Sequence, residues 1–190
     1  MRTPDIKICL DLLARYHVPA HVVEHSLRVA QVGTFVTSRL LMAGHNIDHG
    51  LVEAGAILHD ITKIEAMERG ENHAATGGLL VSSLGYPELA DIVRQHIRLD
   101  QQTEGATLLT SAHIVNYADK RVCHTSIVPL PERFKDLMVR YGISDDRKKT
   151  IEELYEKTKA LEKNIFSQLD LDPEGLCELN NIDIKTYFTP

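Results

Sequence analysis

Apolar residues along most of this chain recur every three or four positions, which is the spacing of one face of an α-helix and not of a strand. The pattern predicts a helix that begins after Asp48, another that starts near Asn72 and ends at residue 84, and further helices over residues 5–16, 21–43, 87–97, 106–124, 131–141 and 146–169. Pro19 and Gly44 separate the first of them, because proline disfavours helical geometry in the preceding residue and glycine suits a helix end. The one strand signal, residues 125–128, is too short to found a sheet. The sequence therefore predicts an all-α fold.

The length of 190 residues fits one domain with an appended element. We expect residues 1–130 to form a helical bundle and residues 131–190 to form a helical extension packed on it, with a partly loose tail after Pro173. Within the extension, apolar residues near heptad spacing form a stripe on one helix: Ile151, Leu154, Thr158, Leu161 and Ile165. Docking of this stripe onto the bundle is the favoured interpretation, and a homodimer contact is the alternative.

The charge balance argues against a nucleic-acid polymer as the partner. The chain has 21 Lys and Arg against 27 Asp and Glu, a formal net charge of −6, whereas proteins that grip a phosphate backbone need a basic surface. Small phosphorylated ligands need only a few local cations, so they remain compatible with this charge. No apolar run approaches the ~18–20 residues of a membrane span, so we expect no membrane partner.

The three cysteines, Cys9, Cys123 and Cys177, are widely scattered and form no CxxC pair. This spacing predicts neither a disulfide framework nor a cysteine-based zinc site. The N-terminus also lacks the basic-then-apolar pattern of a signal peptide. A reducing cytoplasm is therefore the expected location.

The unusual feature of the composition is ten histidines, several of which fall on apolar helix faces. His25 leads a row of valines in the second predicted helix, and Asp119 lies in line with Leu108 and Val115 in the sixth. Five successive helices thus direct imidazole or carboxylate groups to a common interior: His25, His59, Asp60, His73, His96 and Asp119. The remaining histidines fall at helix ends, at breaks or off these faces, which predicts surface or capping roles: His17, His21, His45, His49, His113 and His124.

Buried carboxylates in this number need partners. An isolated ionised carboxylate in an apolar interior costs several kcal/mol, and few cations share the same helix faces. Each residue alone has an ordinary structural interpretation, such as a hydrogen-bonded core histidine. Taken together, neutral imidazoles and carboxylates form the donor set that iron, manganese and zinc accept, so the pattern predicts one or two divalent metals.

The order of these residues resembles the HD superfamily of metal-dependent phosphohydrolases over roughly residues 5–125. The matching segments are His25-Ser26-Leu27-Arg28-Val29-Ala30, Leu58-His59-Asp60-Ile61-Thr62-Lys63 and Tyr117-Ala118-Asp119-Lys120. His73 and His96 match two further histidines of the six-ligand subgroup with a dinuclear centre, which includes hydrolases of symmetric dinucleoside tetraphosphates. Thr62 departs from the pattern, since many members carry glycine there.

The resemblance implies an HD-type helical bundle in which His25, His59, Asp60 and Asp119 bind one metal. It implies a second metal bound by Asp60, His73 and His96, with Asp60 bridging. Iron is the first expectation, with manganese, cobalt and zinc as alternatives. Two such metals can share a hydroxide and clamp a phosphoryl group, so the expected activity is hydrolysis of a phosphate ester or anhydride of a nucleotide-like substrate.

Two cations can reach the same mouth, since Arg28 lies one turn after His25 and Lys63 one turn after His59. Asp60, Lys63 and Arg28 are therefore the candidate catalytic residues, while a surface salt bridge is the alternative role for each cation. Two other functions fit the same donor set. One is a di-iron oxygenase of the HD type, and the other is a metal-binding module with a sensory or structural role.

Overall fold

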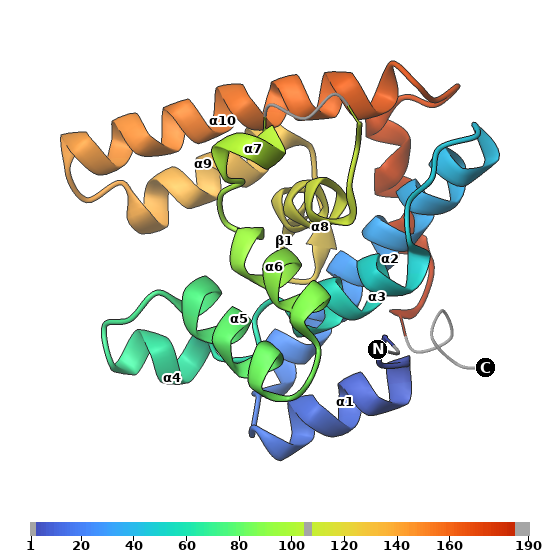
Figure 1. Cartoon of the computed structure of the whole chain (residues 1–190). Coiled ribbons are helices and arrows are strands. Elements are labelled where there is room, and N and C mark those ends of the chain that lie inside the picture. The colour runs from blue at the N-terminus through green and yellow to red at the C-terminus, as the bar shows by residue number, and fades with distance from the viewer. Residues whose placement is uncertain (1–2, 105–107, 185–190) are drawn as a thin grey trace.

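The computed structural model describes residues 3–104 and 108–184, and it is built from helices (Figure 1). A two-stranded antiparallel hairpin of β1 (Val122–Cys123) and β2 (Ser126–Ile127) is the only sheet within those ranges. The helices, in chain order, are α1 (Ile6–Arg15), α2 (Ala20–Met42), α3 (His49–Leu58), α4 (Lys63–Glu68), α5 (His73–Ser83), α6 (Pro87–Gln95), α7 (Gln101–Glu104), α8 (Ser111–Lys120), α9 (Leu130–Tyr141), α10 (Asp145–Phe166) and the 3₁₀ helix η1 (Pro173–Asn181). The all-α prediction is confirmed.

Helices α2, α3 and α8 form the centre of the bundle and pack against one another. Helix α6 covers α3 and α8 and carries α5 on its outer side, while α1 packs on α3 (Figure 1). The valine row that follows His25 on α2 is fully buried in this core, as its spacing predicts: Val29, Val32, Val36 and Leu40. Asp5, Asp48 and Asn72 cap the starts of α1, α3 and α5 by accepting backbone N–H groups.

The structure differs from the predicted helix pattern in one added helix and in the bounds of the sixth helix. The helix predicted after Asp48 ends at Leu58, and a separate short helix that was not predicted, α4, follows after one turn. The predicted sixth helix begins at Ser111, because Thr110 and His113 form a reciprocal capping box that starts α8 there. Leu108 therefore lies outside α8 and is 75% exposed, so its place in the apolar stripe was predicted wrongly. Residues 106 and 107 of the predicted helix lie outside the described residues, and α8 ends at Lys120, before the predicted end at residue 124, because the chain turns there into the hairpin.

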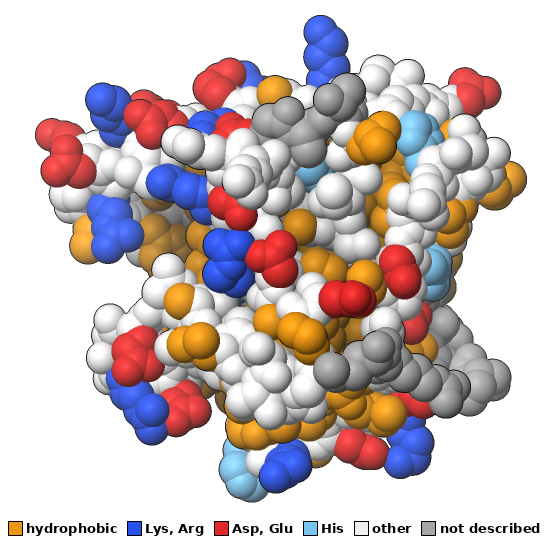
Figure 2. Space-filling view, in the orientation of Figure 1, with side chains coloured by type: hydrophobic (Ala, Val, Ile, Leu, Met, Phe, Trp, Pro, Cys, Tyr) orange, Lys and Arg blue, Asp and Glu red, His pale blue; other side chains and the backbone are white. Residues whose placement is uncertain are grey.

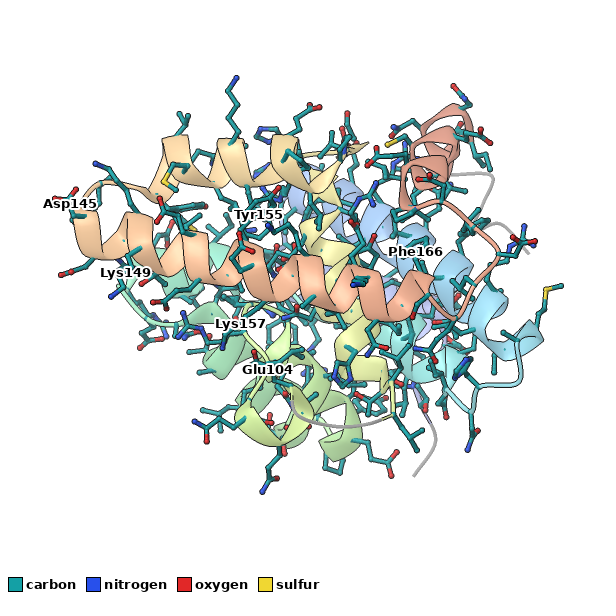
Figure 3. The ribbon with its side chains drawn as sticks, turned by 90° about the horizontal axis from the view of Figure 1, so that it is seen from above. Glu104, Asp145, Lys149, Tyr155, Lys157 and Phe166 are labelled. Atoms are coloured by element: carbon teal, nitrogen blue, oxygen red, sulfur yellow. The ribbon has the colours of Figure 1, made fainter. Side chains whose placement is uncertain are left out.

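The C-terminal extension packs on the bundle through α9 and α10, which both contact α8. Figure 3 shows α10 crossing the molecule, from Asp145 at one end to Phe166 at the other. Four of the five stripe residues on α10 are buried within the chain, so the stripe packs on the rest of the molecule, while the homodimer stays a prediction. The segment after Pro173, predicted to be partly loose, forms η1, which buries Leu176 completely, while residues 185–190 lie outside the description.

A buried polar cluster joins the extension to α8. The guanidinium of Arg121, which is fully buried, donates to Glu162 Oε2 on α10 at 2.8 Å and to the Tyr117 hydroxyl at 2.9 Å. The Tyr117 hydroxyl in turn donates to the same carboxylate oxygen at 2.7 Å. Because one carboxylate satisfies both groups, the position of α10 along α8 is fixed by charge as well as by apolar contact.

No helix in residues 3–104 and 108–184 is long and apolar enough to cross a bilayer.

Replacing Glu162 with alanine should lower the free energy of unfolding by about 3 kcal/mol, because it leaves the buried Arg121 without its carboxylate. Urea denaturation measures this change. Glu156→Ala on the same helix is the matched control, since Glu156 pairs with Lys159 on the surface and its loss should leave stability essentially unchanged. Equal unfolding midpoints for the two variants would show that the buried cluster does not hold the extension.

Candidate metal centre

The six predicted ligand residues come from elements that end or turn at the same place. His25 lies on α2 and Asp119 on α8, while His73 is the first residue of α5. His59 and His96 are the residues at which α3 and α6 end, and Asp60 follows in the turn before α4. The structure therefore brings all six together, from segments that are far apart in the sequence.

One group of donors surrounds the first oxygen of Asp119. His25 Nε2 lies 3.2 Å and His59 Nε2 lies 3.7 Å from Asp119 Oδ1. The ligand atoms of His25, His59 and Asp119 all lie within 4.8 Å of one another, and all three residues are buried. That spacing is small enough for one ion to reach all three side chains.

Asp60 lies between this group and a second one. Its Oδ2 is 3.3 Å from His59 Nε2 and 3.9 Å from His25 Nε2. Its Oδ1 faces the other way, 3.2 Å from His73 Nε2 and 3.6 Å from His96 Nε2. The ligand atoms of His59, Asp60 and His96 also lie within 4.8 Å of one another. One carboxylate thus offers a different oxygen to each group.

Backbone carbonyls orient three of the four imidazoles. The Nδ1 atoms of His59 and His96 each lie 2.7 Å from the carbonyl three residues earlier, at Ala56 and Val93. His25 Nδ1 lies 2.8 Å from the carbonyl of His124. A carbonyl can only accept, so Nδ1 carries a proton and Nε2 is the ring nitrogen that faces the cluster.

The charges of the cluster suit a cation. Burial raises the pKa of Asp60, but His59, His73 and Lys63 outweigh it and hold this pKa well below its usual value. At Asp119, burial likewise raises the pKa of the carboxyl, but Lys120 and His25 outweigh burial and lower this pKa well below its usual value. Burial, together with His59, lowers the pKa of His96 to about 3. Ionised carboxylates and a neutral imidazole are the forms that coordinate metals.

Two buried atoms of the cluster carry no hydrogen bond within the described part of the chain: His59 Nε2 and Asp60 Oδ1. His59 is fully buried and Asp60 is only 2% exposed, so water does not compensate freely for the missing partners. Both are atoms that metals accept, and each belongs to the group of His59, Asp60 and His96. The donor set and its orphaned atoms therefore fit a bound divalent metal.

Residues 22–122 match the family model of the HD domain. The chain belongs to the HD domain family. Members of this family are generally metal-dependent hydrolases, so the predicted superfamily is confirmed at that level. The six-ligand dinuclear subgroup and the likeness to dinucleoside tetraphosphate hydrolases stay predictions.

Two curated relatives are similar in sequence to this HD domain protein. A tRNA (cytidine(56)-2'-O)-methyltransferase of Thermoplasma volcanium is 27% identical over 177 residues, which cover 91% of this chain and 50% of that protein. The chain thus spans about half the length of the methyltransferase. An uncharacterized protein of Methanocaldococcus jannaschii is 28% identical over 134 residues, covering 64% of this chain and 78% of the relative.

The crystal structure of a predicted HD superfamily hydrolase from an uncultured Thermotogales bacterium has a similar fold. The TM-score is 0.50 with 20% sequence identity, and the alignment covers 88% of this chain and 94% of the other. At this identity the likeness concerns the fold, and it extends beyond the family match into the C-terminal helices.

Lys63 lies beside the cluster, as its spacing predicts. Its Nζ is 2.6 Å from Asp60 Oδ2, and its side chain is 25% exposed. Burial lowers the pKa of Lys63, but Asp60 and Asp119 outweigh it and raise this pKa, so the ammonium is charged at neutral pH. Tyr141 at the end of α9 is close enough to Lys63 to contribute to the same shift. Lys63 therefore lies where the cluster meets solvent, at the start of α4.

Arg28 does not take the predicted position at the mouth. Its Nε donates to the Thr125 carbonyl at 3.0 Å, and its Nη1 donates to Gln31 Oε1 at 2.6 Å. Nη1 also donates to the carbonyls of Leu179 and Ile182, at 3.1 and 3.2 Å. The guanidinium is engaged by backbone oxygens of the hairpin and of the segment around η1, so it ties the C-terminal segment to α2.

Two cations that the sequence did not single out as strong candidates stand next to Asp119. Lys120 Nζ donates to Asp119 Oδ2 at 2.9 Å and to the His96 carbonyl at 2.7 Å, which links α8 to the end of α6. Arg133 on α9 is buried and helps to lower the pKa of Asp119. The sequence places Lys120 directly after Asp119, whereas nothing in the sequence places Arg133 near this cluster.

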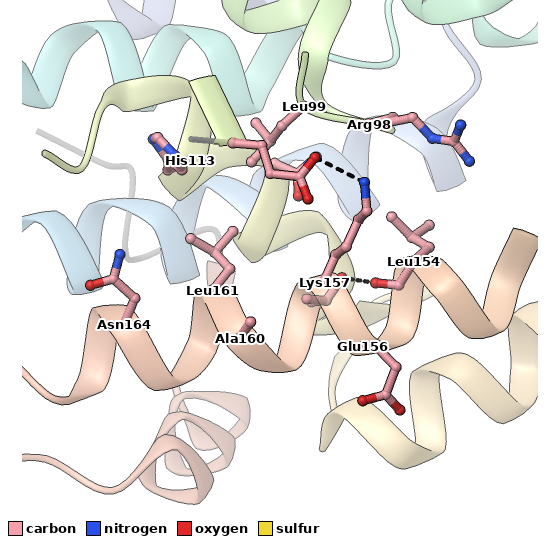
Figure 4. A pocket seen from close by; sticks show the side chains of 12 residues that line it. Arg98, Leu99, His113, Leu154, Glu156, Lys157, Ala160, Leu161 and Asn164 are labelled. Carbon is pink, nitrogen blue, oxygen red and sulfur yellow. Dashed lines mark hydrogen bonds and ion pairs between the residues drawn. The ribbon is translucent and has the colours of Figure 1, made fainter. Parts of the chain in front are cut away.

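A cavity of about 490 Å³ lies on the other side of α8, between that helix, α10 and residues 98–104 (Figure 4). The ion pair of Lys157 and Glu104, 2.9 Å apart, spans it. None of the six cluster residues lines this cavity. Asn116 in its wall donates to the carbonyls of Gln95 and His96, so the cavity borders the support of the metal centre and not the centre itself.

Arg28→Met should release the C-terminal segment and leave the six-residue cluster in place. Hydrogen bonds from a charged donor contribute about 1.5–3 kcal/mol each, so amide exchange in residues 173–182 should become at least about tenfold faster. Hydrogen–deuterium exchange with mass spectrometry measures the rate. Arg39→Met on the same helix is the control, because Arg39 is exposed and stacks on Phe35. Unchanged exchange in this segment would contradict the tethering role of Arg28.

Proposed function

We propose that this HD domain protein is a phosphohydrolase that uses a dinuclear centre to cleave a phosphate ester or phosphoanhydride of a small, nucleotide-like substrate. The observation that carries the proposal is the placement of Asp60, whose Oδ2 faces His25 and His59 while its Oδ1 faces His73 and His96. A buried carboxylate with a purely structural role would need only one set of hydrogen-bond partners.

In this proposal His25, His59, Asp60 and Asp119 hold one metal, and Asp60, His73 and His96 hold the second. Iron is the first candidate, with manganese, cobalt or zinc as alternatives, since the nitrogen and oxygen donors accept all four. Two bound divalent ions supply a hydroxide near neutral pH and stabilise charge on the phosphoryl group. The chain itself contributes the orientation of the donors, through the carbonyls at Ala56, Val93 and His124.

Lys63 is the residue that meets the substrate in this proposal. Its ammonium lies at the border between the buried cluster and solvent, and a fixed positive charge there stabilises negative charge that develops on a phosphoryl oxygen. Asp60 already holds the ammonium in place at 2.6 Å. Lys63 therefore acts by electrostatics and by orienting an anionic group, and it needs no change in its own protonation.

The surroundings of the mouth favour a small substrate with an apolar part. Helix α4, which carries Lys63, and the end of α9 present exposed apolar side chains: Ile64, Met67, Val139 and Ile143. Figure 2 shows the surface hollowed between the α4–α5 and α9–α10 parts of the molecule, with Lys and Arg interspersed among Asp and Glu. A face of mixed charge suits a compact phosphorylated molecule with a base or other apolar group better than a polymer.

The relative from Thermoplasma volcanium is a tRNA methyltransferase and so acts on an RNA, but this chain matches only half of that protein. We therefore do not extend methyl transfer to this chain. A tRNA-derived nucleotide would be compatible with the proposed hydrolysis, and it belongs in any panel of substrates.

Asp60→Ala should remove both metals together, because it takes a donor from each group, and it should also lower thermal stability. Elemental analysis of anaerobically purified protein measures the metal content per chain. Asp11→Ala is the control, since Asp11 is an exposed partner of Lys7 on α1 and its loss should leave the metal content unchanged. Full metal content in purified Asp60→Ala would rule out the ligand assignment.

Lys63→Ala should keep the metal content and lower kcat by about 100-fold, as expected for the loss of one fixed charge at the reacting group. Lys7→Ala, which removes an exposed lysine of α1, should leave turnover unchanged. Steady-state kinetics on a chromogenic phosphodiester and on nucleotides gives both values. If Lys63→Ala loses metal instead, the residue supports the centre and does not act on the substrate.

Turnover itself separates the proposed hydrolase from the two alternatives. The metal-loaded protein should release phosphate or a nucleotide from a panel of phosphate esters and anhydrides equally well with and without O₂. Turnover that requires O₂ would identify a di-iron oxygenase. The absence of any turnover by fully loaded protein over the whole panel would favour a sensory or structural metal module.

A further inference from the structure

A second set of metal-ligand side chains lies outside the six-residue cluster, on the hairpin that follows α8. Cys123 is the last residue of β1, His124 is the first residue of the turn, and Asp136 lies on α9. The ligand atoms of these three residues all lie within 4.8 Å of one another. The His124 side chain is exposed, while Cys123 and Asp136 are half-buried, so a cation can reach the group from solvent.

We propose that Cys123, His124 and Asp136 form a third metal site, which binds a thiophilic divalent cation such as Zn²⁺. Thiolate, imidazole and carboxylate are the three donor types that zinc combines, and three protein ligands leave a position for water. The sequence predicted no cysteine-based zinc site because the cysteines are far from one another. The structure brings one of them to an imidazole and to a carboxylate on another helix instead.

The backbone holds the first two donors in place. His124 has a φ of 54°, in the left-handed region that non-glycine residues rarely adopt, and this conformation turns the chain between the two strands. Cys123 is paired with Ser126 across the hairpin, and β1 also contacts α9. The two donors therefore sit on a short paired turn and not on a free loop, so less conformational entropy is lost on binding.

Two arginines pair with the carboxylate of Asp136. Arg133 Nη1 lies 3.0 Å and Arg140 Nη1 lies 3.5 Å from Asp136 Oδ2. Carboxylates that ligate metals are commonly oriented by such outer hydrogen bonds.

This site shares no ligand with the six-residue cluster and does not depend on the proposed phosphohydrolase activity. The two are nevertheless neighbours, because the carbonyl of His124 is the acceptor of His25 Nδ1 at 2.8 Å. Arg133 also acts on both, since it pairs with Asp136 and lowers the pKa of Asp119. The third site thus lies directly behind one wall of the metal centre.

Cadmium is the probe that separates the two sites, because a Cd²⁺–thiolate bond gives a charge-transfer absorption in the ultraviolet and the six-residue cluster contains no sulfur. Titration of the metal-loaded full chain with Cd²⁺ should produce this band and saturate at one thiolate-bound ion per chain. Cys123→Ser should abolish the band. His124→Asn should lower the affinity for Cd²⁺ at least about tenfold, since it removes a donor, while asparagine tolerates the left-handed backbone.

Cys177→Ser is the matched control and should keep the band, because Cys177 lies near Arg121 and not in this group; Cys9 is fully buried in the core. Circular dichroism checks that each variant is folded. The proposal is overturned by a folded wild-type protein without the band, by a band that persists in Cys123→Ser, or by unchanged affinity in His124→Asn. Cadmium bound only without the thiolate band would mean that the ion enters the six-residue cluster alone.

Discussion

The buried carboxylate of Asp60 is the interaction on which the rest of the molecule depends. It is ionised although it is almost wholly removed from water, and it stands between imidazoles from four different segments of the chain. In an apolar interior such a charge needs nearby positive charge. Lys63 provides part of this positive charge. The other donors around Asp60 can hold a metal cation, which would provide the rest. The helices of the HD domain are placed so that their ends bring this positive charge together at one point, around Asp60.

The surrounding structure fixes the donors from behind. Helix α8 carries Asp119 on the side facing the cluster, and Tyr117 and Arg121 bind Glu162 of α10 from the same helix. Lys120 and Asn116 reach from α8 to the carbonyls at the end of α6, where His96 lies. The C-terminal helices therefore brace the helix that supplies a ligand, although they supply none of the six themselves. Arg28 extends this bracing to the last described segment of the chain.

Five of the six clustered residues could be predicted from periodicity, whereas Asp60 directly follows His59 and its role was implied by the resemblance to the HD superfamily. A histidine or aspartate on an apolar helix face must point into the core, whatever the helix packs on, and five such faces share one interior.

The spacing does not fix where the long side chains of arginine and lysine place their charge. Arg28 and Lys63 have equivalent spacings from their histidines, yet Arg28 binds carbonyls about 150 residues away in the sequence, which no local pattern specifies. No local pattern specifies the position of Arg133 or the contact of Cys123 with Asp136 either, because both depend on how α9 packs against the hairpin. The unpredicted helix α4 and the late start of α8 depended on turn geometry and capping, which are weak signals in one sequence.

The central claim is that one carboxylate joins two metals. Electron paramagnetic resonance of the protein loaded with Mn²⁺ tests it most directly, because two manganese ions that share a bridging ligand are coupled magnetically. At two ions per chain, we predict the spectrum of a spin-coupled pair, which differs from that of isolated Mn²⁺ in its hyperfine pattern and its temperature dependence. A spectrum of two independent ions at full loading, or saturation at a single ion in the six-residue cluster, would contradict the account.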